Sequence, residues 1–123
     1  MAIKITLSDD GSVINIILSG ILGIDQMMKI QDGIAKVSTP LKVIRIDLKE
    51  VMQIDSSVFS SLMLIYFEKN SSTKLELTNC SRAMAHQFSL AGLDRLMTIG
   101  LDSSPGRDKP RESNTIKDIK NFR

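Results

Sequence analysis

The sequence predicts an α/β domain with a mixed, mostly parallel sheet and an N-terminal β-hairpin. Short runs rich in aliphatic and β-branched residues alternate along the chain with longer runs of helical periodicity, in the order β-β-α-β-α-β-α-β. Only the first two strand runs are separated by a short turn, so the later strands need crossover connections and are predicted to be parallel. The length of 123 residues is typical of a single domain.

The hairpin is predicted from the stretch IKITLSDDGSVINIIL (residues 3–18). Apolar Ile3, Ile5 and Leu7 alternate with polar residues, and this period of two is typical of a strand with one buried face. The second half alternates less strictly. Between the halves, Asp10-Gly11 supplies the positive-φ chemistry that a tight hairpin turn requires.

The stretch IDQMMKIQDGIAKV (residues 24–37) is predicted to be a helix. Its apolar residues recur at intervals of three and four and form one stripe, which comprises Met27, Ile30, Ile34 and Val37. Pro40 ends the helix, and Gly33 costs it up to about 1 kcal/mol relative to alanine. Met28, beside the stripe, either fills the core or is exposed and contributes to a partner-binding surface.

The remaining elements follow from the same two periodicities. They are a strand from Lys42 to Leu48, a helix over residues 56–69, a strand from Thr73 to Asn79, a helix from Arg82 to about Ala91 and a final strand over residues 95–101. Ser81 is placed to cap the third helix and Gly92 to end it. The second helix is apolar around most of its circumference, which predicts either burial on several sides or an exposed apolar face for a partner.

The charges divide the chain at about residue 101. Residues 1–101 carry ten basic and ten acidic residues, whereas residues 102–123 carry six basic and four acidic residues, an excess of two. We therefore expect one folded domain over residues 1–101 and a charged, largely flexible tail over residues 102–123. Both signs are mixed in the tail, which favours a solvated segment over a nucleic-acid-binding arm.

Several classes of site and location are disfavoured. Cys80 is the only cysteine, so neither an internal disulfide nor a cysteine-based zinc site can form. We see no metal-ligand cluster or phosphate-binding glycine loop, and we expect no cofactor. No uncharged apolar run reaches about 18 residues, and the N-terminus does not resemble a secretion signal. These features predict a cytoplasmic protein without a membrane span.

Asp55-Ser56-Ser57 is the most unusual local feature, because three small polar residues join a predicted strand to a predicted helix. Helix starts leave N–H groups unpaired, and Asp55 is a good residue to cap them. A capping role alone would need only one such residue. In a parallel sheet this junction also lies at the edge where sites form, and a serine there is reachable by another enzyme. Both interpretations, cap and modification site, stay open from the residues alone.

The stretch IRIDLKEVMQIDSSVFSSLMLI resembles the signature of the STAS domain family, the anti-sigma-factor antagonists. INIILSGIL resembles the family's second strand, and LTNCSRAMAHQFSLAGLDRLMTIG resembles its last helix and strand, so the resemblance covers about residues 3–101. It implies that Ser56 is phosphorylated by an anti-sigma factor that is itself a serine kinase, and that a phosphatase reverses the modification. It also implies that Asp55 and Ser57 support the loop and bind the partner.

Two features depart from the family pattern. Val58 and Phe59 stand where the family usually has glycine and leucine, and Val58 is expected to add bulk beside Ser56 and narrow a kinase's access. The acidic residue that antagonists often carry near the acceptor is replaced by Gly23, and Asp25 follows two residues later. These four residues complete the predicted partner-binding and loop-supporting set.

The sequence therefore predicts a partner-switching regulator and not an enzyme. His86, the only histidine, has no acidic or cysteine cluster near it in sequence, and no nucleophile-elbow pattern surrounds Ser56. The predicted partners are an anti-sigma factor or related serine kinase and a phosphatase, with no direct contact to nucleic acid. The alternative is a STAS-type adaptor or accessory subunit of a larger complex that is not phosphorylated.

Overall fold

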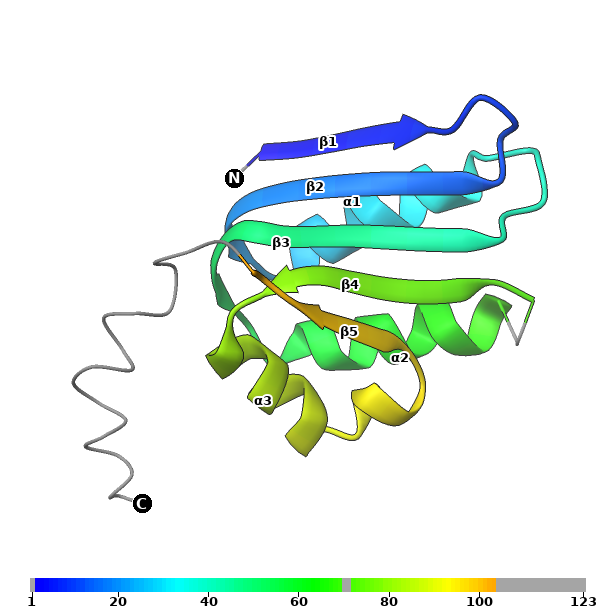
Figure 1. Ribbon diagram of the computed structural model, residues 1–123. Coiled ribbons are helices and arrows are strands. Elements are labelled where there is room, and N and C mark those ends of the chain that lie inside the picture. The colour runs from blue at the N-terminus through cyan, green and yellow to red at the C-terminus, as the bar shows by residue number, and fades with distance from the viewer. Residues whose placement is uncertain (1, 70–71, 104–123) are drawn as a thin grey trace, which may run out of the picture.

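The computed structural model describes residues 2–69 and 72–103 (Figure 1). Its elements follow the predicted order, with one additional 3-10 turn. They are β1 (Ala2–Leu7), β2 (Val13–Leu22), α1 (Ile24–Ala35), β3 (Val43–Ile54), α2 (Ser57–Lys69), β4 (Lys74–Cys80), α3 (Arg82–Leu90), η1 (Leu93–Arg95) and β5 (Thr98–Leu101).

The five strands form one sheet in chain order, β1-β2-β3-β4-β5. The β1–β2 pair is antiparallel and the other three pairs are parallel, so the predicted mixed, mostly parallel sheet is confirmed. Successive crossovers of one hand between neighbouring strands bring their helices to one face. Figure 1 shows α1 and α2 together behind the sheet, which leaves the opposite face uncovered.

The hydrophobic core lies between the sheet and the helices that cover one of its faces. Alternate residues of the three central strands point into it, including Ile14, Ile16, Leu18, Ile44, Ile46, Leu48, Leu75 and Leu77. The predicted apolar stripe of α1 contributes Met27, Ile30 and Ile34 to this core. Phe88 of α3 is fully buried and meets the ring of Phe59 edge-to-face at 5.7 Å between centroids, which joins α3 to α2.

Local turn chemistry matches the sequence closely. Gly11 has φ +74° in the hairpin turn, and Gly92 has φ +82° just after α3. The Ser81 hydroxyl accepts a hydrogen bond from the backbone N–H of Met84 at 3.1 Å and so caps α3, as predicted. Gly33 has a packing reason, because a Cβ there would lie 2.7 Å from Cδ1 of Ile5 on β1.

The third and last strands differ from the prediction. β3 continues to Ile54, six residues past the predicted end at Leu48. Beyond Asp47 it no longer pairs with β4 and runs beside β2 alone, with register shifts. Because this part of β3 has only one neighbouring strand, it tolerates the exposed polar residues Lys49 and Glu50. Their polarity is why the sequence did not predict the extension. The final strand starts at Thr98 and not at residue 95, because η1 occupies Leu93–Arg95.

Most of the expected tail, residues 104–123, lies outside the described residues. Asp102 is described, and its backbone N–H bonds the carbonyl oxygen of Cys80 at 2.9 Å. Within residues 2–69 and 72–103, no helix is both long enough and apolar enough to cross a membrane.

Candidate functional site

Two strand ends and two helix starts meet at one corner of the sheet. β2 leads through Gly23 into α1, and β3 leads through Asp55 and Ser56 into α2. The backbone N–H of Asp55 donates to the carbonyl oxygen of Leu22 at 2.9 Å, which ties the two junctions together. A Cβ on Gly23 would lie 3.9 Å from the Cβ of Asp55. The structure thus brings together the two segments that the sequence analysis singled out.

Asp55 is the cap of α2. Its Oδ1 accepts the backbone N–H of Ser57 at 3.0 Å, and its carbonyl oxygen accepts that of Val58 at 2.9 Å. The carboxylate thereby satisfies one of the donors that a helix start leaves unpaired, and its charge suits the helix dipole. The predicted capping role is confirmed, so Asp55 is committed to the fold whatever else it does.

Ser56 lies on the surface at the first turn of α2. Its residue is exposed, and its carbonyl oxygen accepts the N–H of Phe59 at 3.2 Å. Within the part of the chain that the structure describes, its hydroxyl makes no hydrogen bond. Asp55 caps α2 through its hydrogen bond to Ser57 N–H. The Ser56 hydroxyl is therefore available to solvent or to another protein.

Ser57 turns the other way. Its Oγ is buried and has no hydrogen-bond partner among the described residues, whereas its backbone N–H is held by Asp55. A buried hydroxyl without a partner is unfavourable by about 1–3 kcal/mol. Ser56 and Ser57 therefore have opposite environments, and only Ser56 presents an accessible oxygen.

Val58 and Phe59 support the loop from inside the molecule. Val58 is fully buried, so its side chain adds no bulk to the surface beside Ser56, and that expectation is corrected. The start of α2 points position 58 at the core, which linear spacing did not reveal. Phe59 is partly buried, and its ring meets that of Phe88 of α3 edge-to-face.

Gly23 and Asp25 begin α1 beside this corner. The backbone N–H of Gly23 donates to Oε1 of Gln26 at 2.9 Å, so the helix start is capped without a carboxylate at position 23. Asp25 is exposed in the first turn of α1. A side chain at position 23 would stand next to Asp55. Asp25 instead belongs to the first turn of α1, two residues further along the chain.

An exposed stripe on α2 continues from Ser56. Ser60, Leu64 and Phe67 follow at intervals of four, four and three residues, so they share one side of the helix. Leu64 and Phe67 are 50% and 62% exposed. We call Ser56, Ser60, Leu64 and Phe67 the α2 stripe. The sequence left open whether α2 is buried all round, and the structure shows that it has both a buried side and an exposed apolar side.

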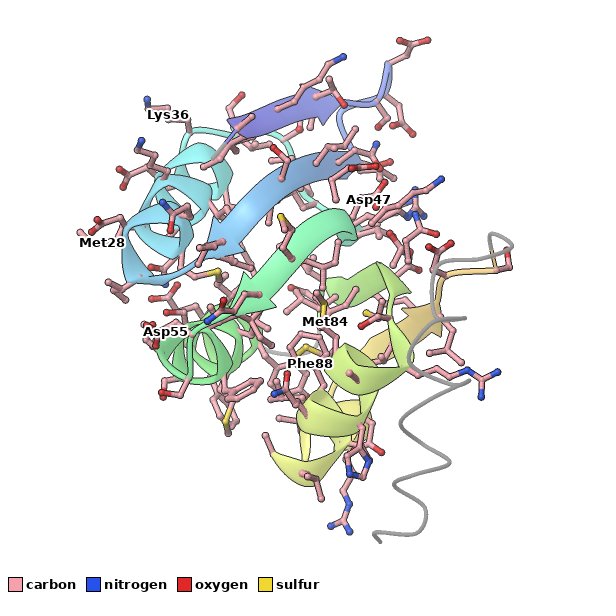
Figure 2. All side chains as sticks on the ribbon, turned by 90° about the vertical axis from the view of Figure 1, so that its left-hand side faces the viewer. Met28, Lys36, Asp47, Asp55, Met84 and Phe88 are labelled. Atoms are coloured by element: carbon pink, nitrogen blue, oxygen red, sulfur yellow. The ribbon has the colours of Figure 1, made fainter. Side chains whose placement is uncertain are left out.

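Two apolar residues of α1 are also exposed. Ile24 is 50% exposed and Met28 is 55% exposed, while Met27 is fully buried. Figure 2 shows Met28 on the outer side of α1, at the same end of the molecule as Asp55. Of the two possibilities for Met28, the structure selects the exposed one.

The sequence analysis missed a hollow on the uncovered face of the sheet, lined by both polar and apolar residues. Its volume is about 240 Å³, and it is lined by Thr6, Asn15, Ile16, Ile17, Arg45, Asp47 and Thr78. Nε of Arg45 contacts Oε1 of Glu76 at 2.8 Å, and the hydrogen bond from Arg45 lowers the pKa of Glu76. The alternating polar residues Arg45, Asp47 and Lys49 in the third strand could have revealed this face.

No candidate metal site is assembled in residues 2–69 and 72–103. These residues contain no cluster of three or more His, Cys, Asp or Glu side chains suited to a metal ion. His86 is exposed on α3, and no hydrogen bond links it to Ser56 or Ser57.

Solved structures of anti-sigma factor antagonists share this fold. The unphosphorylated form of the antagonist SpoIIAA is 16% identical with a TM-score of 0.66, covering 92% of this chain and 99% of that chain. The phosphorylated form of the Bacillus cell fate determinant SpoIIAA is 18% identical, with a TM-score of 0.64 and coverage of 90% and 99%. A Ser-to-Glu variant of RsbS from Moorella thermoacetica is 23% identical, with a TM-score of 0.62 and coverage of 92% and 97%.

The comparison with curated proteins found no match. A family model described as "Mlab, STAS domain" matches residues 5–99, which include all of the corner at Gly23 and Asp55. This match spans more than half of the chain, and the protein belongs to the STAS domain family.

Proposed function

We propose that this STAS protein is a cytoplasmic partner-switching regulator controlled by phosphorylation at Ser56. It binds an anti-sigma factor or a related serine kinase, and a phosphatase restores the unmodified state. The observation that carries the proposal is the contrast at the start of α2. Ser56 is exposed with an uncommitted hydroxyl, while Asp55 provides the cap beside it. The similar fold of SpoIIAA, solved in unphosphorylated and phosphorylated forms, supports this choice of chemistry.

Phosphorylation at Ser56 is compatible with the fold. The new group would stand at a helix N-terminus, where the dipole and the nearby N–H groups favour negative charge. The hydrogen bond from Ser57 N–H to Asp55 would remain, because it does not involve the Ser56 hydroxyl. The modification is therefore expected to change the surface without disrupting the fold.

The effect falls on the α2 stripe. A phosphate adds a charge of about −1.5 to −2 at pH 7. It would be placed next to the Asp55 carboxylate and at the head of a surface whose other end is Leu64 and Phe67. A partner that buries this apolar surface would have to bury or face that charge, which is unfavourable unless a cation meets it. Phosphorylation is therefore expected to release the partner.

The test is a pull-down from the native cell with wild type, Ser56→Ala and Ser56→Asp as baits, combined with phosphopeptide mapping. Ser38→Asp is the matched control, because Ser38 is also exposed but lies in the loop after α1, at the other end of that helix. We expect a kinase-like partner with wild type, Ser56→Ala and Ser38→Asp, and loss with Ser56→Asp. Equal recovery by Ser56→Asp and wild type would falsify the switch.

The second candidate is a constitutive adaptor or accessory subunit. Gly23 favours it, because the antagonists' acidic residue is absent and α1 is capped by Gln26 instead. The exposed Ile24, Met28 and Leu64 also suit a permanent interface. In the same pull-down, this candidate predicts one complex with every Ser56 variant and no phosphate at Ser56.

A further inference from the structure

We propose that the hollow on the uncovered face of the sheet binds a free α-amino acid in its zwitterionic form. The hollow lies over β2 and β3, between side chains that cross the sheet in rows. It is distinct from the corner at Ser56, and Figure 2 shows its lining residue Asp47 well separated from Asp55. The proposal goes beyond the partner switch and does not depend on phosphorylation.

The register of the strands places the lining side chains in two rows. The first row comprises Thr6, Asn15 and Arg45 on β1, β2 and β3, and the second comprises Ile17, Asp47 and Thr78 on β2, β3 and β4. Ile44 and Ile46, which alternate with Arg45 and Asp47 along β3, are buried under the helices. Both rows therefore point to the uncovered face, and the hollow of about 240 Å³ lies between them.

Asp47 contributes a carboxylate that the protein holds in place. Its Oδ1 accepts the backbone N–H of Lys49 at 2.9 Å and Nδ2 of Asn79 at 3.0 Å. Its Oδ2 makes no hydrogen bond within residues 2–69 and 72–103. Asn79 has φ +58°, the one positive φ among the described non-glycine residues, and a residue held in this region is common at functional sites. One oxygen of Asp47 is thus fixed, and the other is available to a ligand.

Arg45 contributes donors that are also held in place. Its Nε donates to Oε1 of Glu76 at 2.8 Å, and its Nη1 donates to Oδ1 of Asn15 at 3.4 Å. In the part of the chain that the structure describes, neither Nη2 of Arg45 nor Nδ2 of Asn15 makes a hydrogen bond. Lys74 also contacts Glu76, at 3.5 Å, so Arg45, Lys74 and Glu76 together keep one positive charge.

The charges of the two rows select a zwitterion. The Arg45 row is positive and the Asp47 row is negative, so a ligand carboxylate is favoured at the first and a ligand ammonium at the second. A simple anion would face Asp47, and a simple cation would face Arg45, so neither complements both rows. Ile17 lies beside Asp47 and is 42% exposed, which provides an apolar contact for an aliphatic ligand side chain.

The spacing of the two charged residues selects an α-amino acid. Arg45 and Asp47 are two residues apart on one strand, which separates their Cα atoms by about 7 Å. The ammonium nitrogen and carboxyl carbon of an α-amino acid are about 2.5 Å apart. With a charge-assisted hydrogen bond at each end, such a ligand spans roughly 8 Å. The two lengths are similar, so one α-amino acid can bridge the rows.

Titration of the full chain with L-valine, followed by NMR, tests the site without any change to the protein. We expect signals of the two rows to shift with a dissociation constant of about 1–10 mM, because the hollow is open to solvent. N-acetylvaline lacks the ammonium and valinamide lacks the carboxylate, so each should bind at least about tenfold more weakly. Equal binding of the three compounds, or no shift in the rows up to about 50 mM valine, overturns the proposal.

Two substitutions in the hollow provide an independent test. Asp47→Asn keeps an oxygen for Lys49 and Asn79 but removes the charge, and Arg45→Gln removes the opposite charge. Each should weaken valine binding by at least about tenfold, with circular dichroism confirming the fold. Glu50→Gln is the matched control, since Glu50 is an exposed carboxylate of β3 that does not line the hollow. Unchanged affinity in both hollow variants, or an equal loss in Glu50→Gln, refutes the site.

Discussion

The carboxylate of Asp55 accepts the backbone N–H of Ser57 at 3.0 Å and so spans the residue between them. Because Asp55 makes this hydrogen bond, Ser56 is not needed to cap the helix. Asp55 fixes the helix start, and Ser56 is held on the surface with its hydroxyl uncommitted. A modification of Ser56 can then alter binding without removing the cap.

The cap predicts a specific pattern of stability. Asp55→Ala should lower the free energy of unfolding by about 1 kcal/mol, because it removes the oxygen that satisfies the Ser57 N–H. Asp55→Asn should retain most of the stability, since asparagine caps as well. Urea denaturation at neutral pH measures both. Equal losses in the two variants would show that the charge and not the hydrogen bond matters.

Asp10 predicts an acid dependence of stability. Its Oδ1 accepts the hydroxyl of Ser12 at 2.7 Å, the backbone N–H of Ser12 at 3.0 Å and the hydroxyl of Ser8 at 2.8 Å. These bonds, chiefly those from Ser12, lower the pKa of Asp10 from 3.8 to about 2. A depressed pKa in the folded state stabilises above the unfolded value and loses that contribution as pH falls through the folded one.

The stability advantage of wild type over Asp10→Asn should therefore be constant above about pH 4 and should shrink between pH 3.8 and about 2. Denaturant titrations across this pH window measure it. Asp9→Asn is the neighbouring control, and the same pH dependence in that variant would remove Asp10 as the cause.

The ion pair on the uncovered sheet face predicts a titration shift. Arg45 lowers the pKa of Glu76 through a hydrogen bond, and desolvation opposes it. Arg45→Ala should raise the pKa of Glu76 towards its ordinary value, because both the donor and the charge are lost. Carboxyl chemical shifts followed by NMR against pH give the value. Lys74→Ala should have a smaller effect, since Lys74 lies at 3.5 Å and contributes less.

Gly33 predicts an interaction between α1 and β1. Alanine in a helix is favoured over glycine by up to about 1 kcal/mol, but its Cβ would press on Cδ1 of Ile5. Gly33→Ala should therefore stabilise the protein more in an Ile5→Val background, where that methyl group is missing. A double-mutant cycle by urea denaturation measures the coupling. Equal gains in the two backgrounds would show that Ile5 yields freely.

Local sequence chemistry determined the elements and their order. The turn at Gly11, the cap at Ser81, the stop at Gly92 and the buried side of α1 at Met27 all depend on residues within one turn or one strand of each other. Such features are written in the periodicity of the chain and in the few residue types that accept positive φ or cap a helix. The resemblance to the STAS family came from the same short segments.

Only the tertiary structure decided what each side chain faces. The length of β3 depends on β2 running beside it, the burial of Val58 depends on the direction in which α2 leaves Asp55, and the exposure of Ile5 depends on β1 having no outer neighbour. These are contacts between segments far apart in the sequence, and linear spacing carries no record of them. The sequence by itself thus named Ser56 as a candidate, while packing set Ser56 outward and Ser57 inward.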